Sequence, residues 1–84
     1  MDIRDAYATL QGALARLAAI EQALDAAEAS YRLQVEDYRV NLVNNLDVLQ
    51  SLQQLQDARR EAIRARHEAK RRSWQLLAAS GETL

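Results

Sequence analysis

The sequence predicts an all-α chain, specifically a long antiparallel two-helix coiled-coil hairpin, and three observations support this fold class. The 84 residues contain no proline and only two glycines, so the residues that punctuate strands and tight turns are missing. Apolar residues recur every three or four positions in both halves of the chain, and one polar break separates the halves. We therefore expect a single hairpin over residues 1–84, with a helix over about 2–40, a turn over about 41–45 and a helix over about 46–80.

The first helix is predicted from a heptad stripe with two alternating seam positions. One position holds Ile3, Leu10, Leu17, Leu24, Tyr31 and Tyr38, and the other holds Tyr7, Leu14, Glu21, Glu28, Val35 and Leu42. Spacings of four and three keep both sets on one face of a helix. A second face carries the small residues Ala8, Gly12, Ala15, Ala19, Ala26 and Ala29. Small residues permit close approach of another helix. Because two helices alone bury little core, we expect self-association or marginal stability in isolation.

The second helix is predicted to begin at a cap provided by Asn44 or Asn45. With Asn44 as the cap, Asp47 lies three residues further on, near the free amides of the first turn. Gly81 is a predicted helix stop. The seam of this helix is expected at Val48, Leu52, Leu55, Ala62, Ala69 and Leu76, with Arg59, Arg66 and Ser73 in the alternate positions.

Folding the chain back near residue 43 gives one register that matches both halves. Paired seam residues then have numbers that sum to 86, so that Leu24 meets Ala62 and Tyr31 meets Leu55. The remaining pairs of this series are Tyr38 with Val48, Leu17 with Ala69, and Leu10 with Leu76. The two acidic interruptions of the first stripe find basic partners in the same register: Glu21 faces Arg66 and Glu28 faces Arg59. Such ion pairs contribute only about 0.2–1 kcal/mol each, so they specify register more than stability.

Composition and motif content favour a binding or structural role over catalysis. The carboxylates, serines and the single His67 are scattered along helices, so the sequence predicts neither an enzyme, nor a metal site, nor a cofactor. Residues 59–72 hold seven Lys or Arg against two Glu, which is one possible nucleic-acid or anionic-membrane signal. The predicted pairing of Arg59 and Arg66, and the absence of interleaved aromatic residues, favour a solvated face without nucleic-acid binding. No apolar run approaches the roughly 20 residues that cross a bilayer, so we expect no membrane insertion by this segment.

The segment from Tyr38 to Leu49 resembles the periplasmic tip of the TolC-like outer-membrane efflux family, whose pattern is roughly Y-x-x-G-x-x-x-x-L-D-V-L. Here the tyrosine is Tyr38 and the last four residues are Leu46-Asp47-Val48-Leu49. Asn41 stands where the family usually has glycine, and asparagine is the next most tolerant residue for a left-handed backbone. Other parts of the chain also resemble the family: Asp2-Ile3-Arg4-Asp5-Ala6-Tyr7-x-x-Leu10, Ala26-Ala27-Glu28-Ala29-Ser30-Tyr31-Arg32-Leu33, Leu52-Gln53-Gln54-Leu55-Gln56-Asp57-Ala58-Arg59, and Leu76-Leu77-Ala78-Ala79-Ser80-Gly81.

The resemblance implies a structural segment of an export duct. Members of the family are homotrimers with an outer-membrane β-barrel and a periplasmic α-barrel, whose tips dock the helical hairpins of a periplasmic adaptor protein. By this resemblance the chain is part of the α-barrel wall, in the periplasmic portion of an outer-membrane protein. The partner-binding tip would comprise Tyr38, Arg39, Val40, Asn41, Leu42, Val43, Asn44, Asn45 and Asp47.

Several tip residues keep a second interpretation. The resemblance implies a part for Tyr38 in closing the duct entrance, although it also fits a seam position. Asp47 fits a helix-start carboxylate as well as a gating residue, and Arg39 fits either a solvated side chain or a tip ion pair. For the whole chain, the alternative is a freestanding coiled-coil interaction module whose basic second helix binds an acidic partner.

Overall fold

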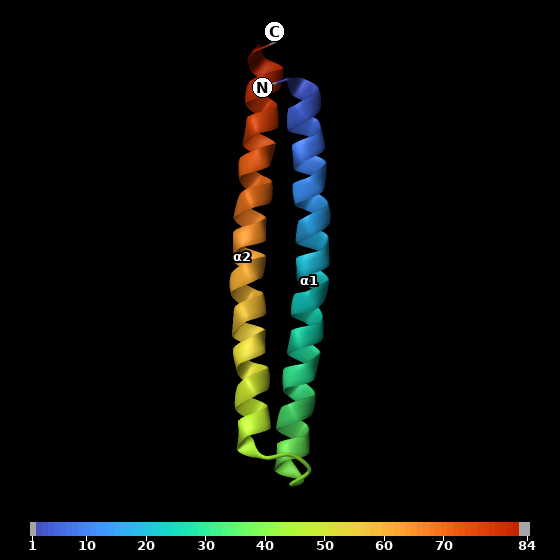
Figure 1. Ribbon diagram of the computed structural model, residues 1–84, viewed down its shortest axis with the longest axis vertical. Helices are drawn as coiled ribbons and strands as arrows, with labels where there is room; N and C mark the ends of the chain where they lie inside the picture. Colours follow the sequence, from blue (N-terminus) through green and yellow to red (C-terminus); the bar gives the residue numbers. More distant parts are fainter. Residues whose placement is uncertain (1, 83–84) are drawn as a thin grey trace.

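The fold is a straight antiparallel helical hairpin. A computed structural model describes residues 2–82, in which helix α1 spans Ile3–Arg39 and helix α2 spans Asn45–Glu82 (Figure 1). The two helices lie side by side along a rod of 64 × 14 × 12 Å, with the connecting turn at one end and both chain ends at the other. The predicted fold class is therefore confirmed. We refer to the turn as the closed end and to the opposite end as the open end.

Both helices are as long as the sequence predicts, with small differences at their ends. Asp2 caps α1, because its carboxylate accepts a hydrogen bond of 3.4 Å from the backbone N–H of Arg4. At the other end of the chain, α2 continues through Gly81 to Glu82, so the predicted stop at Gly81 is wrong. Gly81 does not have a positive φ, the conformation that a glycine helix stop requires.

The core is a thin seam between the helices. Leu24, Leu55 and Ala62 form its buried centre, and Ile20, Ala27, Tyr31 and Ala58 pack against it. The predicted pairs Leu24 with Ala62 and Tyr31 with Leu55 thus belong to one cluster, which supports the predicted register. With so few buried side chains, the hairpin depends on contact along its whole length rather than on a central core.

The structure differs from the prediction in the second set of seam positions, those that alternate with the main stripe. The residues one position before Tyr7, Leu14 and their heptad equivalents turn inward, and of the predicted positions only Glu21, Glu28 and Val35 are partly buried. Ala6 is buried and Ala13, Ile20, Ala27 and Gln34 are partly buried, whereas Tyr7 and Leu14 are half-exposed. On α2, Ser51, Ala65 and Ala79 are buried and Ala58 and Arg72 are partly buried, whereas Arg59, Arg66 and Ser73 are exposed. Size explains the alanine positions: alanines facing the partner helix let the helices approach closely, which leaves larger neighbours such as Tyr7 and Arg59 at the edge of the contact.

One of the two predicted interhelical ion pairs is present. Arg66 Nε donates a hydrogen bond of 3.0 Å to Glu21 Oε1, which joins α2 to α1 in the predicted register. The second prediction is wrong, because the described residues include no ion pair between Glu28 and Arg59. The carboxylate of Glu28 lies 3.9 Å from Arg32 instead, one turn further along α1, where no interhelical reach is needed. Neither helix, within the described residues, holds a stretch both long and apolar enough to cross a membrane.

Candidate functional site

The closed end begins with a left-handed residue that terminates α1. Asn41 has a φ of 63°, the only positive value at a non-glycine residue within the described chain. The N–H of Asn41 donates to the carbonyl of Tyr38 at 3.1 Å, and the N–H of Leu42 donates to the carbonyl of Asp37 at 2.8 Å. These two bonds form a Schellman motif, in which the left-handed residue is usually glycine. The backbone conformation expected at Asn41 is therefore confirmed.

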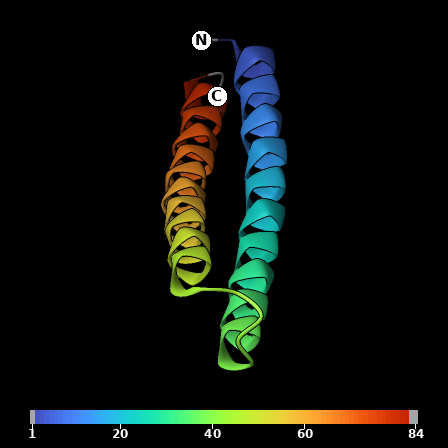
Figure 2. The same cartoon turned by 60° about the horizontal axis from the view of Figure 1, so that its bottom comes forward.

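The start of α2 is fixed by a reciprocal pair of hydrogen bonds. The side-chain oxygen of Asn44 accepts from the N–H of Asp47 at 3.0 Å, and the carboxylate of Asp47 accepts from the N–H of Asn44 at 3.3 Å. This is a capping box, here built from Asn and Asp. The predicted cap at Asn44 is confirmed, and Asp47 acts as the helix-start carboxylate. Only Leu42 and Val43 lie between the left-handed residue and the cap, so the turn is held at both of its ends (Figure 2).

The closed end exposes apolar side chains rather than only polar ones. Leu42 is 73% exposed and Val40 is 63% exposed, which makes Leu42 the most exposed large apolar side chain in the described chain. The prediction that Leu42 lies in the seam is therefore wrong, because α1 ends at Arg39 and the Schellman turn directs the chain away from the seam. Tyr38 is also half-exposed, so it is not buried against Val48. We call Tyr38, Val40 and Leu42 the tip apolar cluster.

The other predicted tip residues surround this cluster. Arg39 is exposed and forms an ion pair of 3.7 Å with Glu36. Asn45 is exposed as the first residue of α2, and Val43 is partly buried. Leu46 and Leu49, in the first turns of α2, are likewise exposed and extend the apolar surface beyond the turn itself. The prediction omitted these two leucines, although their place beside the turn in the Leu46-Asp47-Val48-Leu49 motif was visible in the sequence.

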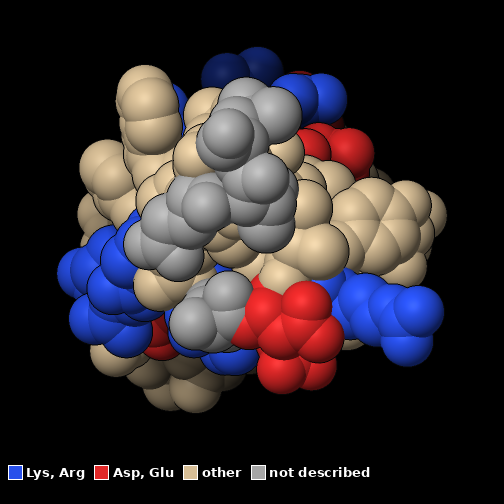
Figure 3. All heavy atoms as spheres, turned by 90° about the horizontal axis from the view of Figure 1, so that it is seen from above, with Lys and Arg blue, Asp and Glu red and all other residues tan. Residues whose placement is uncertain are grey.

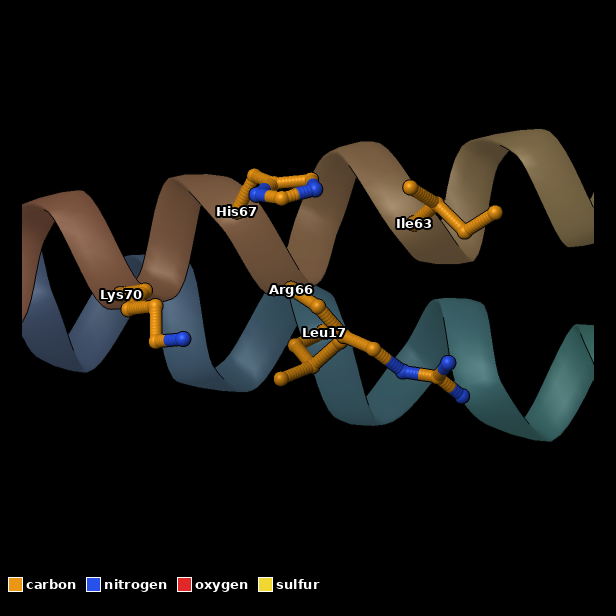
Figure 4. A pocket seen from close by; sticks show the side chains of 5 residues that line it. All are labelled: Leu17, Ile63, Arg66, His67 and Lys70. Carbon is orange, nitrogen blue, oxygen red and sulfur yellow. The ribbon is translucent and has the colours of Figure 1, made fainter.

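A second surface feature is a groove between the helices in the open half of the rod. It has a volume of about 450 Å³ and is lined by Leu17 of α1 and by Ile63, Arg66, His67 and Lys70 of α2. Figure 4 shows the Arg66 side chain extending across α1 beside Leu17, with Ile63 and His67 on α2. The groove combines an apolar floor with cationic side chains, although Arg66 is already paired with Glu21. Sequence analysis did not single out Leu17, Ile63 or Lys70 as groove residues, because the groove forms only when the helices pair.

The charges of the basic segment are partly neutralised within the hairpin. Arg72 lies 3.5 Å from Glu68, four residues away on the same helix, and Arg60 pairs with Asp57. Viewed from the open end, Lys and Arg alternate with Asp and Glu around the rim of the rod (Figure 3). No group of three potential metal-ligating side chains occurs among the described residues.

Comparisons with protein-family models, with curated proteins and with solved structures find no match to this chain. A function can therefore be inferred only from the chemistry of the closed end and of the groove.

Proposed function

We propose that the chain is a helical hairpin of the periplasmic α-barrel wall of a TolC-like outer-membrane export duct, with its closed end as the adaptor-docking tip. In this proposal the parent protein is a homotrimer of the outer membrane, and the chain serves as a structural segment without enzymatic activity. The motif from Tyr38 to Leu49 suggests the family, and the rod shape suits a segment of a helical wall.

The observation that carries the proposal is the tip apolar cluster on a rigid turn. A loop that served only to connect two helices would need no exposed leucine at its apex, yet Leu42 is 73% exposed there. The Schellman motif at Asn41 and the capping box at Asn44 hold this apolar apex in one conformation. A pre-organised apolar apex flanked by amide side chains suits docking against the helical hairpin of another protein, since little conformational entropy is lost on binding.

The direct test is binding of the purified chain to the purified hairpin of a periplasmic efflux adaptor. Leu42→Asp is expected to weaken this binding at least tenfold, because it places a charge at the centre of the apolar apex. Leu33→Asp is the matched control, since Leu33 is a similarly exposed leucine on α1 away from the tip. Equal affinity for the original chain and Leu42→Asp would contradict the docking role.

A second test uses export by the trimeric parent. Asn44→Trp adds bulk to the turn and Asn41→Leu places a branched residue at a φ of 63°. Both variants are expected to lower adaptor-dependent drug resistance while leaving the trimer intact. Unchanged resistance in both would count against the assignment of the tip.

The groove supports a second candidate function, a freestanding interaction module that binds an acidic partner helix. An apolar side chain of such a helix would rest on Leu17 and Ile63, and its carboxylates would face Lys70 and His67. Lys70→Glu is then expected to abolish binding of an acidic amphipathic peptide. Arg71→Glu provides a control with the same change of charge at an exposed site that does not line the groove. Equal loss in both variants would indicate general electrostatic attraction instead.

A further inference from the structure

The exposed apolar side chains of α2 follow a single line along the helix. Within the described part of α2 they number five and fall on one series of positions with spacings of three and four. The complete series is Leu46, Leu49, Gln53, Gln56, Arg60, Ile63, His67, Lys70, Trp74 and Leu77, and every member is exposed. We call this series the outer stripe of α2. Its spacing is that of a coiled-coil seam, but no helix of this chain covers it.

The outer stripe lies mostly on the side of α2 away from α1. Leu49 and Arg60 each lie two positions before a buried seam residue, which at 3.6 residues per turn is a rotation of about 200°. Ile63 and Lys70 directly follow the buried Ala62 and Ala69, about 100° from the seam, so they also border the groove beside Leu17. The stripe is therefore available to a second molecule while the hairpin stays closed.

We propose that the outer stripe is a self-recognition surface on which a second copy of this chain docks in antiparallel orientation. The stripe is self-complementary in the register whose paired numbers sum to 123, because four of its five apolar residues then meet one another. Leu46 then lies opposite Leu77 of the second copy, and Leu49 lies opposite Trp74 of the second copy. The polar middle pairs in the same register: Gln53 with Lys70, Gln56 with His67, and Arg60 with Ile63. Such a pairing is isologous and closes as a two-fold dimer of hairpins, a four-helix assembly.

The charges favour the antiparallel orientation over the parallel one. A parallel, in-register pair would set Arg60 against Arg60 and Lys70 against Lys70 of the second copy, which is repulsive. The antiparallel register sets Lys70 against an uncharged glutamine and lays the aliphatic stem of Arg60 along Ile63. Beside the stripe, Asp57, which already pairs with Arg60 of its own helix, faces Arg64 of the second copy. On the opposite flank, Arg59 approaches Arg66 of the second copy, whose charge is already paired with Glu21 at 3.0 Å.

Two kinds of contact have different roles in this dimer. The apolar ends supply affinity, because Leu46, Leu49, Trp74 and Leu77 each contribute twice by symmetry. The polar middle sets the register, because a shift by one heptad would place Lys70 against Leu46 in one direction or against Arg60 in the other. The dimer surface does not include the turn over residues 40–44, although its Leu46 and Leu49 adjoin the proposed docking tip. The antiparallel pairing concerns the isolated chain rather than hairpins aligned in one wall.

The first test measures association of the purified full chain by sedimentation equilibrium. Trp74 is the only tryptophan, so burial on dimerisation also shifts its fluorescence emission to shorter wavelength as concentration rises. Leu49→Glu is expected to raise the dimer dissociation constant at least tenfold, since the substitution acts twice in the dimer. Leu33→Glu is the matched control, because it makes the same change on the exposed surface of α1 and should leave the dissociation constant unchanged. A monomer at all concentrations, or equal weakening by both variants, would overturn the proposal.

The second test determines orientation by disulfide formation, which is clean here because the chain has no cysteine. Leu46→Cys and Leu77→Cys are prepared separately and then oxidised with glutathione disulfide, either alone or mixed. In the antiparallel dimer the two copies of position 46 are about 47 Å apart at a rise of 1.5 Å per residue, so only the mixture cross-links. Cross-linking of either variant alone would overturn the antiparallel register. Leu42→Asp, which tests the tip, should leave the cross-linking of the mixture unchanged, so failure of one proposal does not imply failure of the other.

Discussion

Asn41 has a φ of 63°, and the hairpin turn depends on this single left-handed residue. Asn41→Gly relieves the steric cost of that conformation and is expected to preserve or slightly increase the free energy of unfolding. Asn41→Val places a β-branched residue there and should lower it by about 1–2 kcal/mol. Asn45→Val is the control, because Asn45 lies in α2 and asparagine and valine have similar helix propensities. Urea denaturation measures all three, and equal losses at positions 41 and 45 would contradict a special role for the left-handed residue.

Asn44 and Asp47 form the second anchor of the turn through two reciprocal hydrogen bonds. Asn44→Ala should reduce the free energy of unfolding by about 1 kcal/mol, the usual effect of losing an N-cap. Asp47→Ala should also destabilise, because it removes the other of the two bonds. The double variant should lose less than the sum, because the loss of either bond frees the first turn and so weakens the remaining bond. A double-mutant cycle in urea measures this coupling. Strictly additive losses would mean that the two caps act separately.

The residues of the turn were predictable from sequence because their interactions are local. The capping box requires only a spacing of three residues. The left-handed site was expected from the resemblance to a family that usually has glycine at the position of Asn41. The exposure of Leu42 was not predictable in the same way, because the heptad pattern continued one step past the point where α1 ends at Arg39. The predicted ion pair between Glu28 and Arg59 was wrong for a related reason. Arg32 offers Glu28 a partner within the same helix, and no sequence pattern decides between Arg32 and Arg59.

At the scale of the helices, sequence periodicity located the seam to within one residue on each helix. The stripe through Leu17 and Leu24 was correct, but the companion positions were assigned to Tyr7 and Leu14 rather than to Ala6 and Ala13. A hydrophobicity pattern favours the larger apolar side chain of two neighbours. Close packing of two helices instead favours the smaller one, and this preference acts only when the other helix is present.

Gly12 lies on the exposed small-residue face of α1, and a substitution there tests whether another helix packs on this face. A Cβ added at Gly12 meets no atom within 4 Å, and mid-helix glycine costs about 0.8–1 kcal/mol relative to alanine. Gly12→Ala is therefore expected to raise the free energy of unfolding of the purified chain by that amount. Ala15→Gly, on the same exposed face, should lower it by a similar amount. Urea denaturation at low protein concentration measures both, and a loss of stability in Gly12→Ala would show that another helix packs on this face.

The whole molecule is a rod without a broad core, and its exposed apolar side chains lie at the closed end and along the outer stripe of α2 as well as near the open end. Sequence predicted the rod because heptads, caps and the absence of proline all indicate the same hairpin. It did not reveal the outer stripe, because one stripe on each helix already accounted for folding. The second stripe becomes evident only when the seam residues are known and the remaining apolar residues of α2 are found to share one line.

A rod of this kind should gain stability from association, so its thermal midpoint should depend on protein concentration. If the outer stripe forms the proposed dimer, a concentration of free chain about 100-fold above the dissociation constant stabilises the folded chain by about 2.7 kcal/mol. For a domain of this size such a gain raises the Tm by about 10 °C or more. Circular dichroism melts over a wide concentration range measure the effect. Leu49→Glu should remove the dependence and leave the low-concentration Tm nearly unchanged, because Leu49 is exposed in the single hairpin. Leu33→Glu should retain the dependence, and a Tm independent of concentration in the original chain would contradict stabilisation by the outer stripe.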